Sequence, residues 1–171
     1  MDDRIDALLA DVEAAGTAAE LHARRGELGD EVAAQAAERT LLERLRGAIG
    51  QRVQVVLPAG GVVGTAEFLG RGIVVVTGTE TSVIAIGSIC GLRTASRRHR
   101  MEVGGLERLG MGSALRRLSA LHAEVSIDVP GRSGPVRGRC EFVGADYVEI
   151  AGRIIPFAAI SAVHARVNPF G

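Results

Sequence analysis

A segment of this chain occurs twice, and this duplication limits the folds that the chain can adopt. Residues 61–76 return in related form at residues 135–150, with the shared pattern G-x-x-E-F-[LV]-G-x-x-[IY]-V. The identical residues in the first and second copies are Gly64 and Gly138, Glu67 and Glu141, Phe68 and Phe142, Gly70 and Gly144, and Val74 and Val148. Self-similarity at a fixed offset indicates one structural unit used twice. The sequence therefore predicts a duplicated architecture.

Alternating apolar residues surround both copies, as expected of half-buried strands. The predicted strands of the first copy lie near residues 51–57, 62–69, 73–77, 81–86 and 89–92. Those of the second copy lie near residues 125–129, 136–143, 147–150, 154–157 and 160–163. A short helical pattern precedes each set, at residues 40–45 and 113–121. The repeated unit is thus one helix followed by five strands.

The N-terminal region has a different pattern. Residues 2–48 are rich in Ala, Leu, Glu and Arg and contain no Pro, which favours helix, while a few glycines in the teens and twenties allow a hairpin. The sparse apolar stripe suits either an amphipathic helix folded against its own chain or a coiled coil with another subunit. The interface candidates on this stripe are Leu8, Val12, Leu21 and Leu28.

Charge is balanced overall but unevenly distributed. The 171 residues have zero formal net charge, and all 20 basic residues are Arg, a composition that resembles proteins of GC-rich actinobacterial genomes. Residues 1–50 carry 11 acidic and 6 Arg side chains (−5), and residues 93–117 carry 7 Arg and 2 Glu (+5). This balance argues against a general polyanion binder but allows one local basic patch.

No stretch approaches the roughly 18 apolar residues that a membrane helix requires, and the N-terminus has no cationic, apolar leader. We therefore expect a cytoplasmic protein without a membrane partner. Cys90 and Cys140 stand apart from each other and from the histidines, so we expect small buried residues rather than metal ligands.

A short helix, five bent antiparallel strands and a Gly within the long second strand resemble the Sm-like fold, a small SH3-type barrel. Gly64 and Gly138 match the bend of the family's second strand, and residues 83–89 and 154–160 look like its fourth strand, turn and fifth strand. The resemblance implies five-stranded barrels that assemble edge to edge. The turns at residues 69–73 and 143–147 lack the family's base-binding residues, so RNA binding is not carried over.

The two copies differ at positions that should point away from each core. At a constant offset, the aligned pairs are Val63 and Arg137, Thr65 and Arg139, Val75 and Glu149, and Gln54 and Asp128. The first copy thus has an apolar exterior, which we expect to be covered by the N-terminal helix, the second copy or another subunit. Val56, Val63 and Val75 are the interface candidates on this exterior.

An Arg-rich connector is the candidate for nucleic-acid contact, through the phosphate backbone. Its candidate residues are Arg97, Arg98, Arg100, Arg116 and Arg117. Few aromatic residues are available for base stacking. Glu67 and Glu141 are expected to point outward and pair with Arg. We identify no catalytic, metal or cofactor site, and no small-molecule substrate.

The predicted fold class is α+β: a long N-terminal helix or helical hairpin, then two tandem five-stranded Sm-like barrels, each preceded by a short helix. The predicted domains are a helical segment with coiled-coil potential at 1–48, barrels at 49–93 and 113–167, and an Arg-rich linker at 94–112. Phe68 and Phe142 are expected in the two cores. The predicted function is a non-enzymatic adaptor that forms homo-oligomers or binds a protein partner. The alternative is a nucleic-acid-associated regulatory factor.

Overall fold

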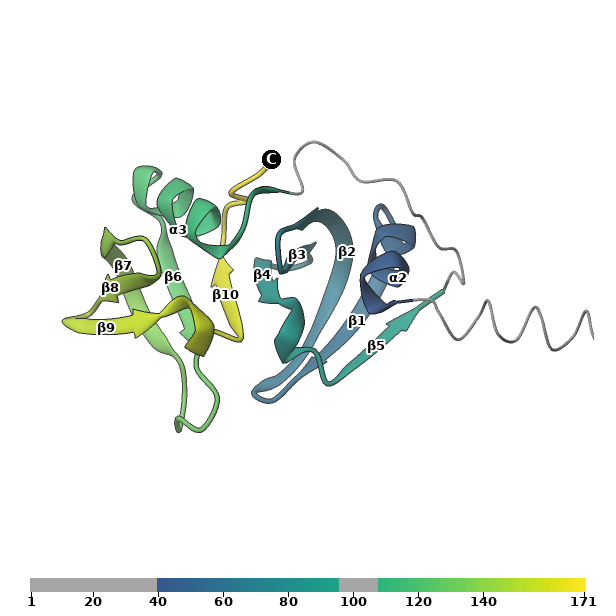
Figure 1. Ribbon diagram of the computed structural model, residues 1–171, viewed down its shortest axis with the longest axis horizontal. Coiled ribbons are helices and arrows are strands. Elements are labelled where there is room, and N and C mark those ends of the chain that lie inside the picture. Colours follow the sequence, from purple (N-terminus) through teal and green to yellow (C-terminus); the bar gives the residue numbers. More distant parts are fainter. Residues whose placement is uncertain (1–39, 96–107) are drawn as a thin grey trace, which may run out of the picture. The chain divides into compact units, whose positions relative to one another are not determined.

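The computed structural model describes residues 40–95 and 108–171 (Figure 1). We call residues 41–95 the first half and residues 108–171 the second half. The elements of the first half are α2 (Leu41–Ala48), β1 (Arg52–Leu57), β2 (Gly60–Gly70), β3 (Ile73–Thr77), β4 (Thr81–Ala85), the 3-10 helix η1 (Ile86–Ser88) and β5 (Gly91–Thr94). Those of the second half are α3 (Met111–Ala120), β6 (Glu124–Asp128), β7 (Val136–Val143), β8 (Tyr147–Ile150), β9 (Arg153–Pro156), the 3-10 helix η3 (Phe157–Ala159) and β10 (Ala162–Ala165).

All ten strands belong to one antiparallel sheet, in the order β5-β1-β2-β3-β4-β10-β6-β7-β8-β9. The predicted fold class, with two separate five-stranded barrels, is therefore wrong, because the strands of both halves form one continuous sheet. The two five-strand sets merge because β4 pairs with β10, with Ile84 opposite Ala162 and Thr81 opposite Ala165. The α-helices of the described residues are both short. The sheet is open, and β5 and β9 are its opposite edges (Figure 1).

The strand order within each half is nevertheless the same. Reading from the last strand of each half, the order is β5-β1-β2-β3-β4 in the first and β10-β6-β7-β8-β9 in the second. Each second strand also has a bulge at the same place, between Ala66 and Phe68 and between Cys140 and Phe142. The registers therefore define equivalent positions in the two halves.

Gly64 shows why the second strand needs a small residue. It lies opposite Val53, and a Cβ at this position would collide with the backbone carbonyl of Thr77 on β3. Only Gly allows the strands to approach this closely. Its equivalent, Gly138, lies opposite Val125 and has a φ of 154°.

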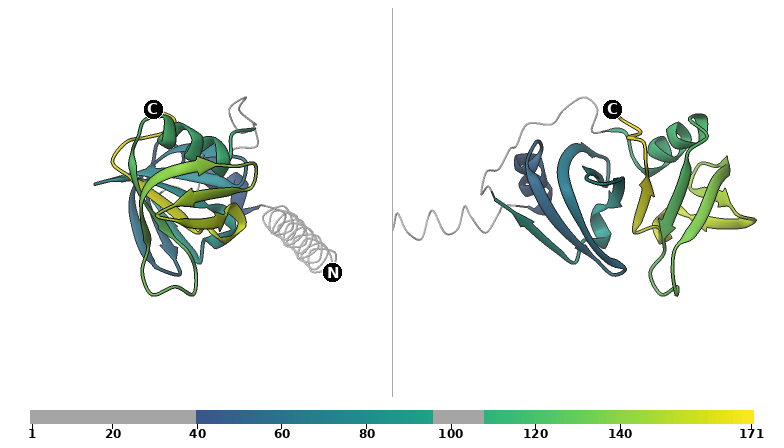
Figure 2. Two further views of the ribbon diagram at one scale, coloured as in Figure 1. Left: turned by 90° about the vertical axis from the view of Figure 1, so that its left-hand side faces the viewer. Right: turned by 180° about the vertical axis from the view of Figure 1, so that it is seen from behind.

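The apolar residues form two clusters, one beneath each helix. α2 contributes Leu45 and Ala48 to the cluster that β1 to β4 share. α3 packs against β7 and β4, and its buried face recurs at helical spacing. This face consists of Met111, Ala114, Leu115 and Leu118. α2 thus covers strands of its own half, whereas α3 covers β7 of its own half and also contacts β4 of the first half (Figure 2).

Strands β3 and β4 are buried on both faces. Val74 and Ile84 point into the cluster of the first half, whereas Val75 and Val83 belong to the cluster of the second half. We expected the apolar exterior of the first copy to be covered by the N-terminal helix, the second copy or another subunit. The structure shows that the second half covers Val75 and Val83. Central strands buried on both sides read as continuous apolar runs, as Ile73–Thr77 does.

The two repeat phenylalanines occupy different environments, and the prediction that both are core residues is wrong for Phe142. Phe68 packs against the cluster of the second half and stacks on Phe170, with ring centroids 4.2 Å apart. Phe142 is 53% exposed and contacts Tyr147 at a centroid distance of 6.0 Å. Each bulge turns its phenylalanine to the opposite sheet face from the residue before the bulge, which is Ala66 for Phe68 and Cys140 for Phe142. On that face, Phe68 contacts the second half of the chain, whereas Phe142 remains exposed.

The strand predictions are confirmed to within about two residues. The largest differences are at β5 and β10, which begin at Gly91 and Ala162 because the 3-10 helices η1 and η3 precede them. Most of the predicted N-terminal helix and of the linker at 94–112 lies outside the described residues.

Candidate functional site

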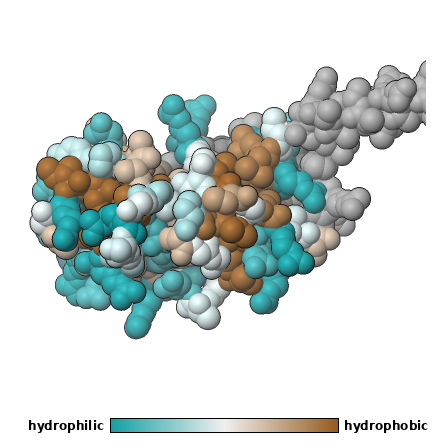
Figure 3. All heavy atoms as spheres, turned by 90° about the horizontal axis from the view of Figure 1, so that it is seen from below, coloured by the Kyte–Doolittle hydropathy of each residue, from teal (hydrophilic) through white to brown (hydrophobic). Residues whose placement is uncertain are grey.

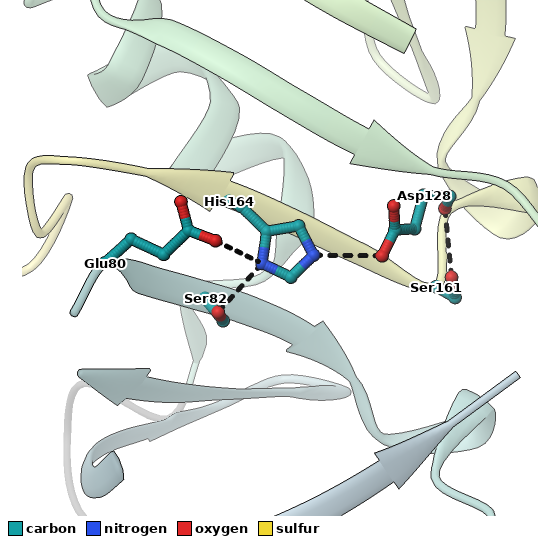
Figure 4. A network of polar contacts seen from close by, with 5 residues as sticks. All are labelled: Glu80, Ser82, Asp128, Ser161 and His164. Carbon is teal, nitrogen blue, oxygen red and sulfur yellow. Dashed lines mark hydrogen bonds and ion pairs between the residues drawn. The ribbon is translucent and has the colours of Figure 1, made fainter. Parts of the chain in front are cut away.

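A polar network crosses the junction of the two halves, on β4, β6 and β10 (Figure 4). His164 of β10 lies between two partners: its Nδ1 is 2.9 Å from Ser82 Oγ, and its Nε2 is 2.9 Å from Asp128 Oδ2. Glu80 Oε1 approaches Nδ1 at 3.7 Å. The Ser161 hydroxyl donates to the backbone carbonyl of Asp128 at 3.0 Å.

The hydrogen-bonding capacity of these groups fixes the tautomer of His164. An ionised carboxylate can only accept, so Nε2 carries the proton that is donated to Asp128. In the neutral ring, Nδ1 then accepts from the Ser82 hydroxyl. The side chains of His164 and Asp128 are 13% and 16% exposed, so the network is largely shielded from water. It joins the two halves by side-chain contacts in addition to the backbone ladder.

A Ser, a His and an Asp in contact are also the components of a nucleophilic triad, but this geometry does not support one. In a triad the Ser contacts Nε2 and the Asp contacts Nδ1, whereas here the two partners are exchanged. Ser82 is also only 2% exposed, so a substrate cannot reach its hydroxyl. The arrangement stabilises the junction rather than activating a nucleophile.

A cleft of about 570 Å³ opens beside this network, on the outer face of β6, β7 and β10. Its basic residues are Arg137 and Arg139 of β7 and Arg166, which follows β10. His122 and His164 also line it, and its acidic residues are Glu80 and Glu124. The three arginines are exposed, and none of their side chains makes a hydrogen bond or ion pair with another residue in the described ranges 40–95 and 108–171.

The alternation of the strands places these side chains on one face. Val125 and Ile127 point into the core, so Glu124 and Ser126 point out. Ser126 lies opposite Arg137 on one side and opposite His164 on the other. Glu124 lies opposite Arg139. Residues distant in the sequence thus form two rows across the floor of the cleft.

The first half has a smaller groove at the equivalent place, on β1, β2 and β5. Its volume is about 360 Å³. The lining residues are Arg52, Val53, Gln54, Val63, Arg93, Thr94 and Ala95. By register, Val63 is the equivalent of Arg137, and Arg93 the equivalent of His164. The two grooves share a position in the repeat but differ in charge.

The interface candidates of the first copy differ in exposure. Val56 and Val63 are 42% and 47% exposed on the sheet surface beside β5. Val75 is completely buried between the halves and is not available to a partner. Leu8, Val12, Leu21 and Leu28 lie outside the described residues.

The arginine candidates do not form a phosphate site where the structure describes them. Arg116 donates to the carbonyl of Gly144, and Arg117 donates to the carbonyl of Pro169 while lying over the ring of Phe170. Both guanidinium groups therefore hold the second half together. Arg97, Arg98 and Arg100 lie outside the described residues.

Within residues 40–95 and 108–171, the shared glutamates pair with no arginine, contrary to expectation. Glu67 accepts hydrogen bonds from the Thr77 hydroxyl at 2.9 Å and from the Asn168 amide at 2.6 Å. Glu141 accepts from the backbone N–H of Gly152. Both contacts fasten a strand to a following segment, so these glutamates are structural.

The cysteines are free thiols. Cys90 is exposed, and Cys140 is half-buried, where desolvation raises the pKa of its thiol. The expectation of burial thus holds in part for Cys140 and is wrong for Cys90. Among the residues that the structure describes, no group of three His, Cys, Asp or Glu side chains could hold a metal ion. No helix in the same residues is long and apolar enough to cross a membrane.

The junction network was not identified from the sequence, because its members lie on three strands. One comparison between the two copies could have drawn attention to Asp128. A constant offset aligns Asp128 with Gln54, but the registers align it with Val56, because the turn after β6 is two residues longer than the turn after β1. An alignment that allowed for the longer turn would have paired Asp128 with Val56 and shown a charged residue at a position that is apolar in the first copy.

Comparison with models of known protein families found no match for this chain, and comparison with curated proteins found none either. Its function must therefore be argued from its own residues.

Proposed function

We propose that this chain is a non-enzymatic assembly protein whose copies join by strand addition, with the β9 edge of one copy pairing with the β5 edge of the next. The observation that carries this proposal is the β4–β10 junction inside the chain. There an antiparallel pairing already joins the fourth strand of one repeat to the fifth strand of another. β9 and β5 are the equivalents of β4 and β10, and both are edge strands of the sheet that the described residues form.

The surface beside β9 supports this proposal, because it is the exposed equivalent of a buried one. We define the β9 surface by Phe142, Tyr147 and Ile154. Ile154 is the equivalent of Val83, and their exposures are 68% and 1%. In a space-filling view, a small group of apolar atoms lies among polar ones at the end that carries β7 to β9, at the left of Figure 3, and a larger apolar area lies to the right of the centre. Such surfaces on a soluble domain commonly mark interaction sites.

The β5 edge offers the matching half of the contact. In the junction, Val83 lies opposite Val163. The equivalent of Val163 is Leu92, which is half-buried at the margin of the first cluster. Copying the register places Ile154 of one chain opposite Leu92 of the next, so two apolar side chains meet again.

Two differences between equivalent residues should make the proposed β9–β5 contact between chains weaker than the β4–β10 contact within the chain. Ser82 and His164 face each other in the junction, but their equivalents are Arg153 and Arg93, two like charges. Ala85 donates its N–H to the carbonyl of Ser161, whereas its equivalent is Pro156, which has no N–H. Charge and proline on an edge strand limit uncontrolled pairing. The proposed assembly is thus reversible and depends on concentration.

The first test is the mass of the full chain in solution, measured by light scattering after gel filtration over a range of concentrations. We expect the mass of the wild type to rise above that of one chain, and Ile154→Asp to reduce this rise by placing a carboxylate in the contact. Leu121→Asp, which makes the same kind of change at an exposed position after α3 and away from β5 and β9, is the matched control. A strictly monomeric wild type, or equal effects of the two variants, contradicts the proposal.

A charge-reversal series tests the register and separates this contact from any association through the N-terminal region. Arg153→Glu and Arg93→Glu should each strengthen association by roughly threefold to tenfold, because an opposite pair replaces a like pair. The double variant should return to the wild-type affinity. Added salt should strengthen association of the wild type and weaken that of Arg153→Glu. Three variants that associate equally would exclude this register.

The cytoplasm is the compartment that fits this proposal. Both cysteines of the chain are free thiols, as is usual in a reducing environment.

A further inference from the structure

The cleft on β6, β7 and β10 combines a defined hollow with positive charge that no acidic residue in the described ranges pairs with. Three guanidinium groups, from Arg137, Arg139 and Arg166, line a volume of about 570 Å³. This volume lies within the usual range of small-ligand sites, about 300 to 1,000 Å³. The cleft is separate from the free edges β5 and β9 that the proposed assembly uses.

The equivalent groove of the first half provides an internal reference. The positions of Arg137 and Arg139 are occupied there by Val63 and Thr65. The position that follows the last strand changes from Ala95 to Arg166. The second copy thus has arginine at three positions where the first has Val, Thr and Ala, and all three line one cleft. The groove of the first half has its own arginines, Arg52 and Arg93, at the positions of Glu124 and His164.

The carboxylates of the region do not neutralise these arginines. Asp128 accepts from His164 Nε2, and Glu80 lies 3.7 Å from His164 Nδ1. Glu124 lies opposite Arg139 in the register, but the two side chains form no ion pair. With three Arg against two Glu along the lining, the charge is positive even when both histidines are neutral. An anionic group can therefore enter without displacing an existing ion pair.

Phosphate is the anion that this chemistry fits best. A guanidinium group donates two parallel N–H bonds to phosphate oxygens, and His122 offers a further donor on the wall. None of the residues that line the cleft is Phe, Tyr or Trp, so we expect a ligand to be held mainly by its phosphate rather than by stacking of a base.

We propose that this cleft binds a phosphate group through Arg137, Arg139 and Arg166. The phosphate belongs either to a small phosphorylated compound or to a nucleic-acid backbone, and the two sources share this chemistry. The proposal is independent of the assembly described above.

The experiment uses the full chain and two probes at low salt. Pyrophosphate binding is measured by titration calorimetry, and binding of a labelled oligothymidylate by fluorescence anisotropy. The test variant, Arg137→Val with Arg139→Thr, carries the residues of the first half. The control, Arg71→Ala with Arg132→Ala, removes the same charge from exposed residues outside the cleft.

We expect at least one probe to bind, and the test variant to weaken that binding by about tenfold or more, as expected for lost charge-assisted hydrogen bonds. The control should bind as the wild type does. Binding of both probes, or of pyrophosphate alone, indicates a small phosphorylated ligand. Binding of the oligonucleotide alone, with a salt slope that the test variant reduces, indicates the backbone.

Failure of both probes to bind overturns the proposal, as does equal weakening in the test and control variants. The substituted residues are exposed, so the melting temperature of the test variant should match that of the wild type. If the double variant does not fold, Arg166→Ala alone gives the same decision.

Discussion

The outer surface of β3 and β4 is equivalent in the repeat to the outer surface of β8 and β9. The first surface is buried, and the second is exposed to solvent. On the first, Val75 and Val83 are buried by the other half of the chain. On the second, the equivalent residues are Glu149 and Ile154, and the surface faces solvent. One backbone arrangement therefore serves as an internal contact in one half and as an open edge in the other. The substitutions follow this division only in part: Val75 is replaced by Glu149 and Ala85 by Pro156 on the uncovered surface, whereas Ile154 keeps the apolar character of Val83.

The largest effect should come from placing the charge of the open surface on the covered one. Val75→Glu introduces a carboxylate with no partner at a completely buried position, and should cost more than about 4 kcal/mol of unfolding free energy. The reverse exchange, Glu149→Val, should change stability by less than about 0.5 kcal/mol, because this residue is half-exposed. Urea denaturation measures both values. Similar losses in the two variants would show that the two surfaces are not different.

A second comparison uses the repeat phenylalanines. Phe68→Ala should cost about 2 to 3 kcal/mol, because it removes a half-buried ring that stacks on Phe170. Phe142→Ala should cost less than about 1 kcal/mol, because the ring is 53% exposed. Thermal unfolding at low protein concentration, where the proposed assembly is dissociated, measures the difference. Equal costs would place Phe142 in a core after all.

A third comparison concerns the fifth strands. His164→Ala leaves Ser82 and Asp128 without their partner in a shielded site and should cost about 1 to 3 kcal/mol. Arg93→Ala, at the equivalent position on the free edge β5, should change stability by no more than about 0.5 kcal/mol. Chemical denaturation tests both. If His164→Ala leaves the unfolding free energy unchanged, the backbone hydrogen bonds between β4 and β10 hold the junction without the side-chain network.

The smallest effect concerns the two thiols, one in each half. At mildly alkaline pH, Cys140 should react more slowly with a disulfide reagent than Cys90 does, because Cys140 is half-buried and its raised pKa keeps it protonated. The Cys90→Ser and Cys140→Ser variants isolate each rate. As the pH rises further, the rate of Cys140 should increase once its thiolate forms. A faster Cys140 would show that the second half opens around β7.

The lengths and spacing of the elements were predictable because they depend on local rules. Alternation and turn chemistry located ten strands, and helical spacing located α2 and α3. The candidate sites were less predictable. Arg137 and Arg139 stood out when the copies were compared, but His164, Asp128 and Ser82 did not, since their contacts join positions up to 82 residues apart.

By itself, the sequence determined a duplicated unit of one helix and five strands, its strand limits and the differences in charge between the copies. The tertiary structure alone decided that β4 pairs with β10, so that ten strands form one sheet and Val75 becomes interior while Ile154 stays outside. The reason is physical. Strand formation follows from neighbouring residues, whereas the pairing of an edge depends on which distant backbone reaches its free N–H and C=O groups.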